Sequence, residues 1–68
     1  MNTTEIVLGT SSCKEFKTGW SVSFDRIGSW YHTIVRNARG DIHDKMRCDD
    51  YRTAREYYRA FCGIARNA

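Results

Sequence analysis

The sequence predicts an α+β fold in which an antiparallel, three- or four-stranded β-meander packs against one C-terminal α-helix. Two observations support this. Apolar residues alternate through residues 16–48, around two turn signatures, and after residue 49 they follow a helical period. A chain of 68 residues forms at most one domain. We therefore expect a single domain over 1–68, with an N-terminal arm or edge strand at 1–15, the meander at 16–48 and the helix at 50–66.

The N-terminal segment leaves two structures open. The short apolar run Glu5-Ile6-Val7-Leu8 is followed by Gly9-Thr10-Ser11-Ser12, a composition typical of a turn. The run forms either a fourth strand at the sheet edge or an arm packed on the domain. Phe16 and Thr18 continue the alternation of the next strand, and we expect them to extend it toward its N-terminus.

Two similar turn signatures, Asp25-Arg26-Ile27-Gly28 and Asn37-Ala38-Arg39-Gly40, lie twelve residues apart. The first side chain of each can hydrogen-bond its own turn, and the final Gly suits a type I turn with a G1 bulge. This geometry pairs residue 25 with 29 and residue 37 with 41. The register then places nine residues on the core side of the sheet: Trp20, Val22, Phe24, Trp30, His32, Ile34, Ile42, Met46 and Cys48.

The C-terminal helix is predicted from the change of period after Asp49-Asp50. Either Asp can cap the helix start, and Arg66 suits the helix dipole near the other end. Placed on a helical wheel, the apolar residues of this segment share one broad sector, which we expect to lie across the sheet. They are Tyr51, Ala54, Tyr57, Tyr58, Phe61, Ile64 and Ala65.

The charge of the chain is mildly positive, with a formal net charge of +3 and a pI near 9.0, which suits an anionic partner. Eight of the eleven cations are Arg, the residue that holds carboxylates and phosphates bidentately. No apolar run is long enough to span a membrane. The three cysteines form no CxxC motif, and the N-terminus has no secretion signal. We therefore expect reduced thiols, a cytoplasmic location in a host cell and no membrane association.

Four arginines of the helix, Arg52, Arg55, Arg59 and Arg66, fall within about 60° of one another on the wheel. This ridge is either a solvated helix face or a strip that engages phosphates or an acidic protein surface. A second cationic group comes from the strands and turns: Arg26, Arg36, Arg39, Lys45 and Arg47. The alternation places Lys45 and Arg47 on the outer sheet face with Tyr31, Thr33, Val35 and His43. That face is either ordinary exposed surface or one that stacks bases.

Catalysis and metal binding are not expected. His32 and Asp44 share the predicted core side and are interpreted as a structural pair rather than an acid–base dyad, since no nucleophile accompanies them. His43, Cys48 and Cys62 match no zinc spacing. The chain is therefore expected to be no enzyme and to need no cofactor.

The strands and tight turns, followed by Asp49-Asp50-Tyr51-Arg52-Thr53-Ala54-Arg55-Glu56-Tyr57-Tyr58-Arg59-Ala60-Phe61, resemble the small sheet-plus-helix proteins of phages and mobile elements, of the anti-CRISPR type. The resemblance covers roughly residues 16–66. It implies binding to an acidic patch of a host protein or nucleoprotein complex, or to the nucleic acid that such a complex holds. The order of elements is also similar to the double-stranded RNA-binding domain, but residues 1–18 do not predict the helix that precedes its strands.

The first functional hypothesis is a non-enzymatic inhibitor that engages an acidic surface through Arg52, Arg55 and Arg59. Secondary contacts would come from Arg26, Arg39 and Tyr31. The alternative is a sequence-independent nucleic-acid-binding protein that contacts phosphates. A structural or assembly subunit is the third hypothesis.

Overall fold

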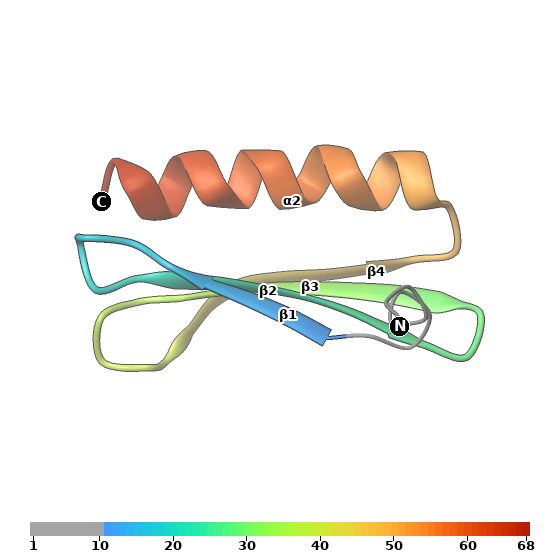
Figure 1. The fold of residues 1–68 in the computed structure, drawn as a ribbon, viewed down its shortest axis with the longest axis horizontal. Coiled ribbons are helices and arrows are strands. Elements are labelled where there is room, and N and C mark those ends of the chain that lie inside the picture. The colour runs from blue at the N-terminus through green and yellow to red at the C-terminus, as the bar shows by residue number, and fades with distance from the viewer. Residues whose placement is uncertain (1–10) are drawn as a thin grey trace, which may run out of the picture.

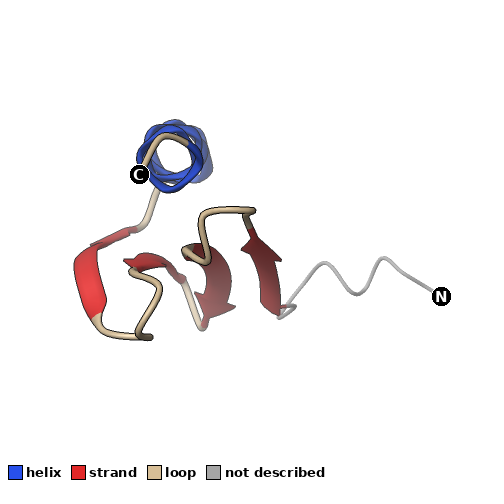
Figure 2. Ribbon diagram, turned by 90° about the vertical axis from the view of Figure 1, so that its left-hand side faces the viewer, coloured by secondary structure: helices blue, strands red, loops and turns tan. Residues whose placement is uncertain are grey.

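The computed structural model describes residues 11–68, which form an antiparallel sheet covered on one face by a single helix (Figures 1 and 2). This confirms the α+β meander, with four strands in the order β1-β2-β3-β4. The segment Glu5–Leu8 lies outside the described residues, and an edge strand occupies 11–15. The elements are β1 (Ser11–Glu15), β2 (Ser21–Ile27), β3 (Trp30–Arg36), β4 (Ile42–Cys48) and α2 (Tyr51–Arg66).

The connection between β1 and β2 is a tight turn. The Gly19 N–H donates to the Phe16 carbonyl at 2.9 Å, and the Phe16 N–H donates to the Trp20 carbonyl at 2.9 Å. Gly19 has a φ of 90°, which suits a residue without a Cβ. The expectation that Phe16 and Thr18 extend the next strand is therefore wrong. Instead, the Thr18 hydroxyl donates to the Ala65 carbonyl at 2.6 Å, which joins this turn to the end of α2.

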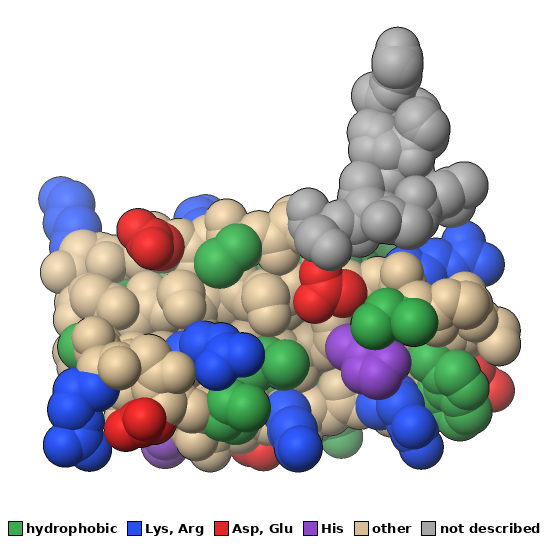
Figure 3. All heavy atoms as spheres, turned by 90° about the horizontal axis from the view of Figure 1, so that it is seen from below, with side chains coloured by type: hydrophobic (Ala, Val, Ile, Leu, Met, Phe, Trp, Pro, Cys, Tyr) green, Lys and Arg blue, Asp and Glu red, His purple; other side chains and the backbone are tan. Residues whose placement is uncertain are grey.

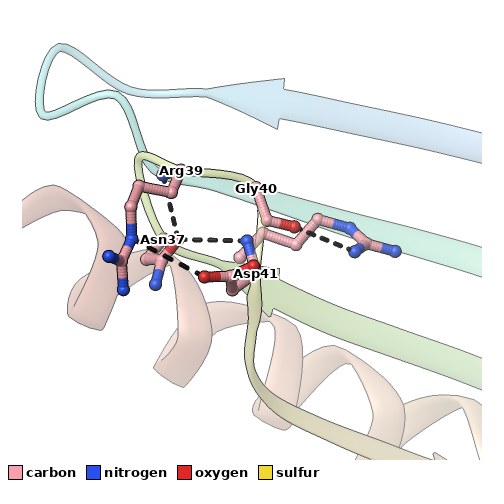
Figure 4. A network of polar contacts seen from close by, with 5 residues as sticks. Asn37, Arg39, Gly40 and Asp41 are labelled. Carbon is pink, nitrogen blue, oxygen red and sulfur yellow. Dashed lines mark hydrogen bonds and ion pairs between the residues drawn. The ribbon is translucent and has the colours of Figure 1, made fainter.

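The turn between β3 and β4 has the predicted geometry. The Gly40 N–H donates to the Asn37 carbonyl at 2.9 Å, and Gly40 has a φ of 90°. The Asn37 side-chain oxygen accepts from the N–H groups of Arg39 at 2.9 Å and Asp41 at 3.0 Å (Figure 4). Asn37 therefore fixes this turn with its own amide, as its position in the signature indicates.

The turn between β2 and β3 differs from the prediction. Ile27 pairs with Trp30, so only Gly28 and Ser29 connect the strands. Gly28 has a φ of 64°, and no non-glycine residue of the described chain has a positive φ. This is the pattern of a type II′ turn with Gly at its first central position. Residue 25 consequently pairs with His32 rather than with Ser29.

The pairing is shifted by three residues, from Ser29 to His32. A shift by an odd number of residues reverses the two faces of β3, because successive side chains of a strand point to opposite faces. Trp30, His32 and Ile34 lie on the face away from α2, so their assignment to the core is wrong. Tyr31, Thr33 and Val35 lie on the helix side, so their assignment to the outer face is wrong as well. They pair there with Arg26, Phe24 and Val22 of β2.

A bulge at the start of β4 offsets the shift for the next strand. Arg36 pairs with Ile42 but Val35 pairs with Asp44, which leaves His43 as an extra residue. Beyond the bulge, Met46 pairs with Thr33 and Cys48 with Tyr31, on the helix side as predicted. Ile42 stays 47% exposed, so its assignment to the core is wrong.

The core lies between α2 and the two central strands. Its buried cluster consists of Val22, Val35, Phe61, Cys62 and Ala65, with Phe16, Trp20, Met46 and Tyr58 packed against it. Thr33 is also fully buried, and its hydroxyl donates to the Ser23 carbonyl at 2.9 Å. This bond satisfies the buried polar group, which would otherwise destabilise the fold.

The helix begins at Tyr51 because Asp50 caps it. The Asp50 carboxylate accepts from the Thr53 N–H at 2.8 Å and from the Thr53 hydroxyl at 2.7 Å. These two bonds, more than the nearby charge of Arg52, lower the pKa of Asp50 below its ordinary value. At the other end, the Asn67 N–H donates to the Gly63 carbonyl.

Candidate binding surfaces

The arginine ridge of α2, formed by Arg52, Arg55 and Arg59, is fully presented to solvent. All three side chains are exposed, whereas the buried positions of the helix, Ala54, Phe61, Cys62 and Ala65, face the sheet. The ridge residues are three and four positions apart, so their side chains are neighbours along one side of the helix. Together with Tyr51 and Glu56 they line a shallow groove.

An aromatic cluster lies beside the start of this ridge, on the helix side of the sheet. The Tyr31 ring lies 5.6 Å from that of Tyr51 and 5.8 Å from that of Phe24, and the Phe24 ring lies 5.6 Å from that of Tyr58. Tyr51 is 52% exposed, so the ring at the end of the cluster is accessible to a partner. Burial, with a smaller contribution from the neighbouring Cys62, raises the pKa of Tyr58.

Two guanidinium groups stack on the tyrosines of this cluster. That of Arg26 lies 5.6 Å from the Tyr31 ring centre, and that of Arg55 lies 5.9 Å from the Tyr51 ring centre. Contacts of this kind hold a long side chain in place while its N–H groups remain free to bind. The β2–β3 hairpin and the helix thereby join in one arginine–tyrosine surface, which consists of Arg26, Tyr31, Tyr51, Arg52, Arg55 and Arg59.

In the described part of the chain, no arginine of this surface forms an ion pair with a carboxylate. Within residues 11–68, the one ion pair joins Arg39 and Asp41 at 3.6 Å, and it lies in the β3–β4 turn. Arg26 donates instead to the Gly28 carbonyl at 3.2 Å. The surface therefore keeps its positive charge available for a partner.

Two of the predicted binding residues lie apart from this surface. Arg66 is in the last turn of α2, where its guanidinium group lies 5.8 Å from the Phe16 ring centre. Arg39 lies in the β3–β4 turn, which is at the end of the molecule opposite the start of the helix (Figure 1). Arg66 lies on the same helix as Arg52 and Arg55 but about three to four turns further along it, and Arg39 belongs to the predicted second cationic group.

The outer face of the sheet carries the remaining predicted residues, Lys45 and Arg47, on the side opposite the core as expected. Lys45 pairs across the strands with Ile34, and Arg47 pairs with His32. The Arg47 guanidinium group lies 4.6 Å from the Trp30 ring centre. Seen from this side, Lys and Arg, His and hydrophobic side chains share the face (Figure 3).

Sequence reasoning missed Tyr51, Trp30 and His32 as surface residues. Tyr51, Tyr57 and Ile64 were assigned to the packed sector of the helix, which is wrong, because they are 52%, 45% and 38% exposed. Trp30 and His32 followed the incorrect register. The His32–Asp44 pair is not formed, because His32 has Asp25 and Arg47 as its cross-strand neighbours while Asp44 pairs with Val35.

Cys13, Cys48 and Cys62 are free thiols. In the described part of the chain, no group of three or more His, Cys, Asp and Glu side chains is arranged to hold a metal ion. The helix at Tyr51–Arg66 is neither long nor apolar enough to cross a membrane. Comparison with known proteins found no matching family model, no matching curated protein and no matching solved structure.

Proposed function

We propose that this protein is a non-enzymatic binding module whose arginine–tyrosine surface docks onto an acidic patch of a host protein or nucleoprotein complex. The observation that supports this most is the combination of two features: the exposed guanidinium groups of Arg52, Arg55 and Arg59, which form no ion pair within residues 11–68, and the exposed Tyr51 ring. Arginine and tyrosine are enriched among the residues that carry binding energy in protein interfaces. Each guanidinium group can form two parallel, charge-assisted hydrogen bonds to a carboxylate.

The charges around the ridge favour a protein partner over a phosphate backbone on this surface. Glu56 lines the same groove as the arginines, and Asp49 and Asp50 stand exposed before the helix. A continuous row of phosphates along the helix would meet these carboxylates. A protein surface presents separate carboxylates, which can match the arginines and avoid the acidic positions.

The role that the anti-CRISPR resemblance implies is inhibition of the bound complex. We extend the proposal to this role, because a module this small can block a partner by covering its surface without any chemistry of its own. In cells defended by a CRISPR–Cas system, expression of the chain is expected to restore phage plaque formation. If the chain restores plaque formation in none of these systems, the inhibitory role is wrong, but the binding proposal is unaffected.

The binding proposal is tested with a triple variant that removes the ridge charge, Arg52→Gln, Arg55→Gln and Arg59→Gln. Protein captured by the wild-type chain from nuclease-treated host extract would be purified, and its Kd for each chain measured by calorimetry. We expect the triple variant to weaken binding by more than about a hundred-fold, since each lost charge-assisted bond contributes about 1 to 3 kcal/mol.

The matched control carries the same change of net charge elsewhere: Lys14→Gln, Lys17→Gln and Arg36→Gln. We expect it to change the Kd by less than about three-fold, because mutation of distant surface charges acts mainly through weak long-range attraction. Equal losses in the two variants would show that net charge, not the ridge, drives binding. Complete loss of capture after nuclease treatment would contradict a protein partner.

A further inference from the structure

The face of the sheet away from α2 carries exposed apolar side chains among polar and charged ones, and no described residue covers it. Ile27 is 62% exposed, Trp30 41% and Ile42 47%. This face is separate from the arginine–tyrosine surface, because the sheet lies between it and the helix (Figure 2). Ile27 and Trp30 form a cross-strand pair at one end of β3, whereas Ile42 pairs with Arg36 at the other end. An exposed apolar pair with a large ring can serve as a contact for a partner.

Two ring systems stand side by side on the central strand β3. Trp30 and His32 are two positions apart, so both rings project from the outer face. Two residues of a strand span about 6.6 Å. This is about twice the 3.4 Å rise between stacked bases of one nucleic-acid strand. Two adjacent bases can therefore reach both rings only if they leave the stack, as the bases of a single strand can.

The neighbouring strand β4 supplies positive charge along the same line. Arg47 stands opposite His32 and its guanidinium group lies over Trp30 at 4.6 Å, while Lys45 stands opposite Ile34. Lys45 and Arg47 line a shallow hollow on the outer face, together with His32, Ile34 and Met46. Within residues 11–68, neither Lys45 nor Arg47 forms an ion pair.

The negative charges of this face lie on the other side of β3. Asp25 of β2 pairs with His32, and Glu15 of β1 pairs with Ser21. The outer face is thus divided lengthwise, with Lys45 and Arg47 on β4, the two rings and Arg36 on β3, and carboxylates on β1 and β2. A phosphate backbone is attracted to β4 and repelled from the β1–β2 half.

We propose that the β3–β4 half of the outer face binds single-stranded nucleic acid, with bases stacked on Trp30 and His32 and phosphates held by Lys45 and Arg47. Stacking on aromatic rings and on guanidinium planes tolerates any base, so binding has little sequence preference. The site goes beyond the proposed function and uses none of its residues. A nucleoprotein partner could be held by its protein on the helix side and by its exposed strand on the sheet side.

The test uses fluorescence anisotropy with labelled oligo-dT, oligo-rU and a duplex of equal length, at several salt concentrations. Three variants are compared with the wild-type chain: Trp30→Leu, the double variant Lys45→Gln with Arg47→Gln, and the ridge triple variant as a control. Circular dichroism confirms that each variant is folded. Leu keeps position 30 apolar but cannot stack.

We expect the single strands to bind more tightly than the duplex. Trp30→Leu is expected to weaken binding about ten-fold, the loss of roughly one base stacking contact. The double variant is expected to reduce the salt slope by roughly 0.7 for each cation removed. The ridge triple variant, whose charges lie behind the sheet, is expected to retain binding within about three-fold.

Three results would overturn this site. They are an absence of single-strand binding even at low salt, a preference for the duplex, and a loss of binding in the ridge variant but not in the Trp30 variant. None of them bears on capture of a protein partner by Arg52, Arg55 and Arg59, which the separate calorimetric measurement decides.

Discussion

The two faces of the sheet are built from the same strands but have opposite environments. On the helix side, Val22, Thr33 and Val35 are fully buried beneath α2. On the outer side, their immediate neighbours in sequence are half-buried or exposed, and Trp30 and Ile34 share that face with Lys45 and Arg47. In β3 the residues Trp30 to Val35 include apolar side chains on both faces, so the hydrophobicity of this strand alone does not show which face the helix covers.

For β3, the geometry of the turn at Gly28 decides which residues form the core and which remain exposed for binding. In β3 every position from Trp30 to Arg36 is compatible with either face. The type II′ turn at Gly28 selects the face, and with it the composition of both candidate surfaces. Variants that separate the two faces test this conclusion in order of expected effect.

The largest effect is expected from Val35→Asp, compared with Ile34→Asp at the adjacent position. A carboxylate at the fully buried position 35 would have no partner and would cost several kcal/mol. A domain of this size has a net stability of only about 3–5 kcal/mol. Circular dichroism should therefore show an unfolded Val35 variant and a folded Ile34 variant, and the reverse result would place the helix on the other face.

Two glycine substitutions are expected to act in opposite directions. An added Cβ meets no atom within 4 Å at either Gly28 or Gly63, so backbone conformation alone decides. Gly28→Ala should destabilise by about 1–2 kcal/mol, because its φ of 64° disfavours L-residues. Gly63→Ala should stabilise by up to about 1 kcal/mol, because it lies within the helix. Urea denaturation measures both, and equal signs would contradict this turn geometry.

The buried hydroxyl of Thr33 is expected to have a smaller effect. Thr33→Val keeps the shape of the side chain but removes the bond to the Ser23 carbonyl, which should lower the free energy of unfolding by about 1 kcal/mol. Ser23→Ala changes only a side chain on the outer face and serves as the control. If the Thr33 variant is as stable as the wild type, this hydroxyl contributes nothing to the core.

The smallest effect is expected from the helix cap and depends on pH. The folded-state pKa of Asp50 is below its ordinary value of 3.8, because the carboxylate accepts two bonds from Thr53. Its contribution to stability is therefore complete above that value and is lost as pH falls through the lowered pKa. Asp50→Asn keeps an acceptor without the charge, so the melting temperature should fall less steeply with acid. Identical acid profiles would exclude this contribution.

The helix could be predicted from sequence because local signals agree: Asp50 caps it, the apolar period runs from Ala54 to Ala65, and Arg66 ends it. The β3–β4 turn was equally local, since Asn37 and Gly40 specify it together. The β2–β3 turn was not, because Gly28 fits the end of a type I turn with a bulge as well as the start of a type II′ turn. Only pairing of the whole strands distinguishes these two turns.

The candidate surfaces could be predicted in part for the same reason. Arg52, Arg55 and Arg59 lie on one helix, so their alignment follows from local geometry. Arg26 and Tyr31 were expected as secondary contacts, but the Tyr31–Tyr51 contact that joins them to the ridge was not predicted, because the incorrect register placed Tyr31 on the outer face. The same incorrect register placed Trp30 and His32 in the predicted core. The bulge at His43 had no signal in the sequence.

Both proposals depend on which side chains of β3 meet the helix, and nuclear Overhauser contacts measure this directly. In a spectrum of the methyl-labelled chain, the Val35 methyl groups are expected to show contacts with Phe61 or Ala65. The Ile34 methyl groups should show none to either helix residue. Contacts from Ile34 to Phe61, with none from Val35, would contradict the register and both binding surfaces built on it.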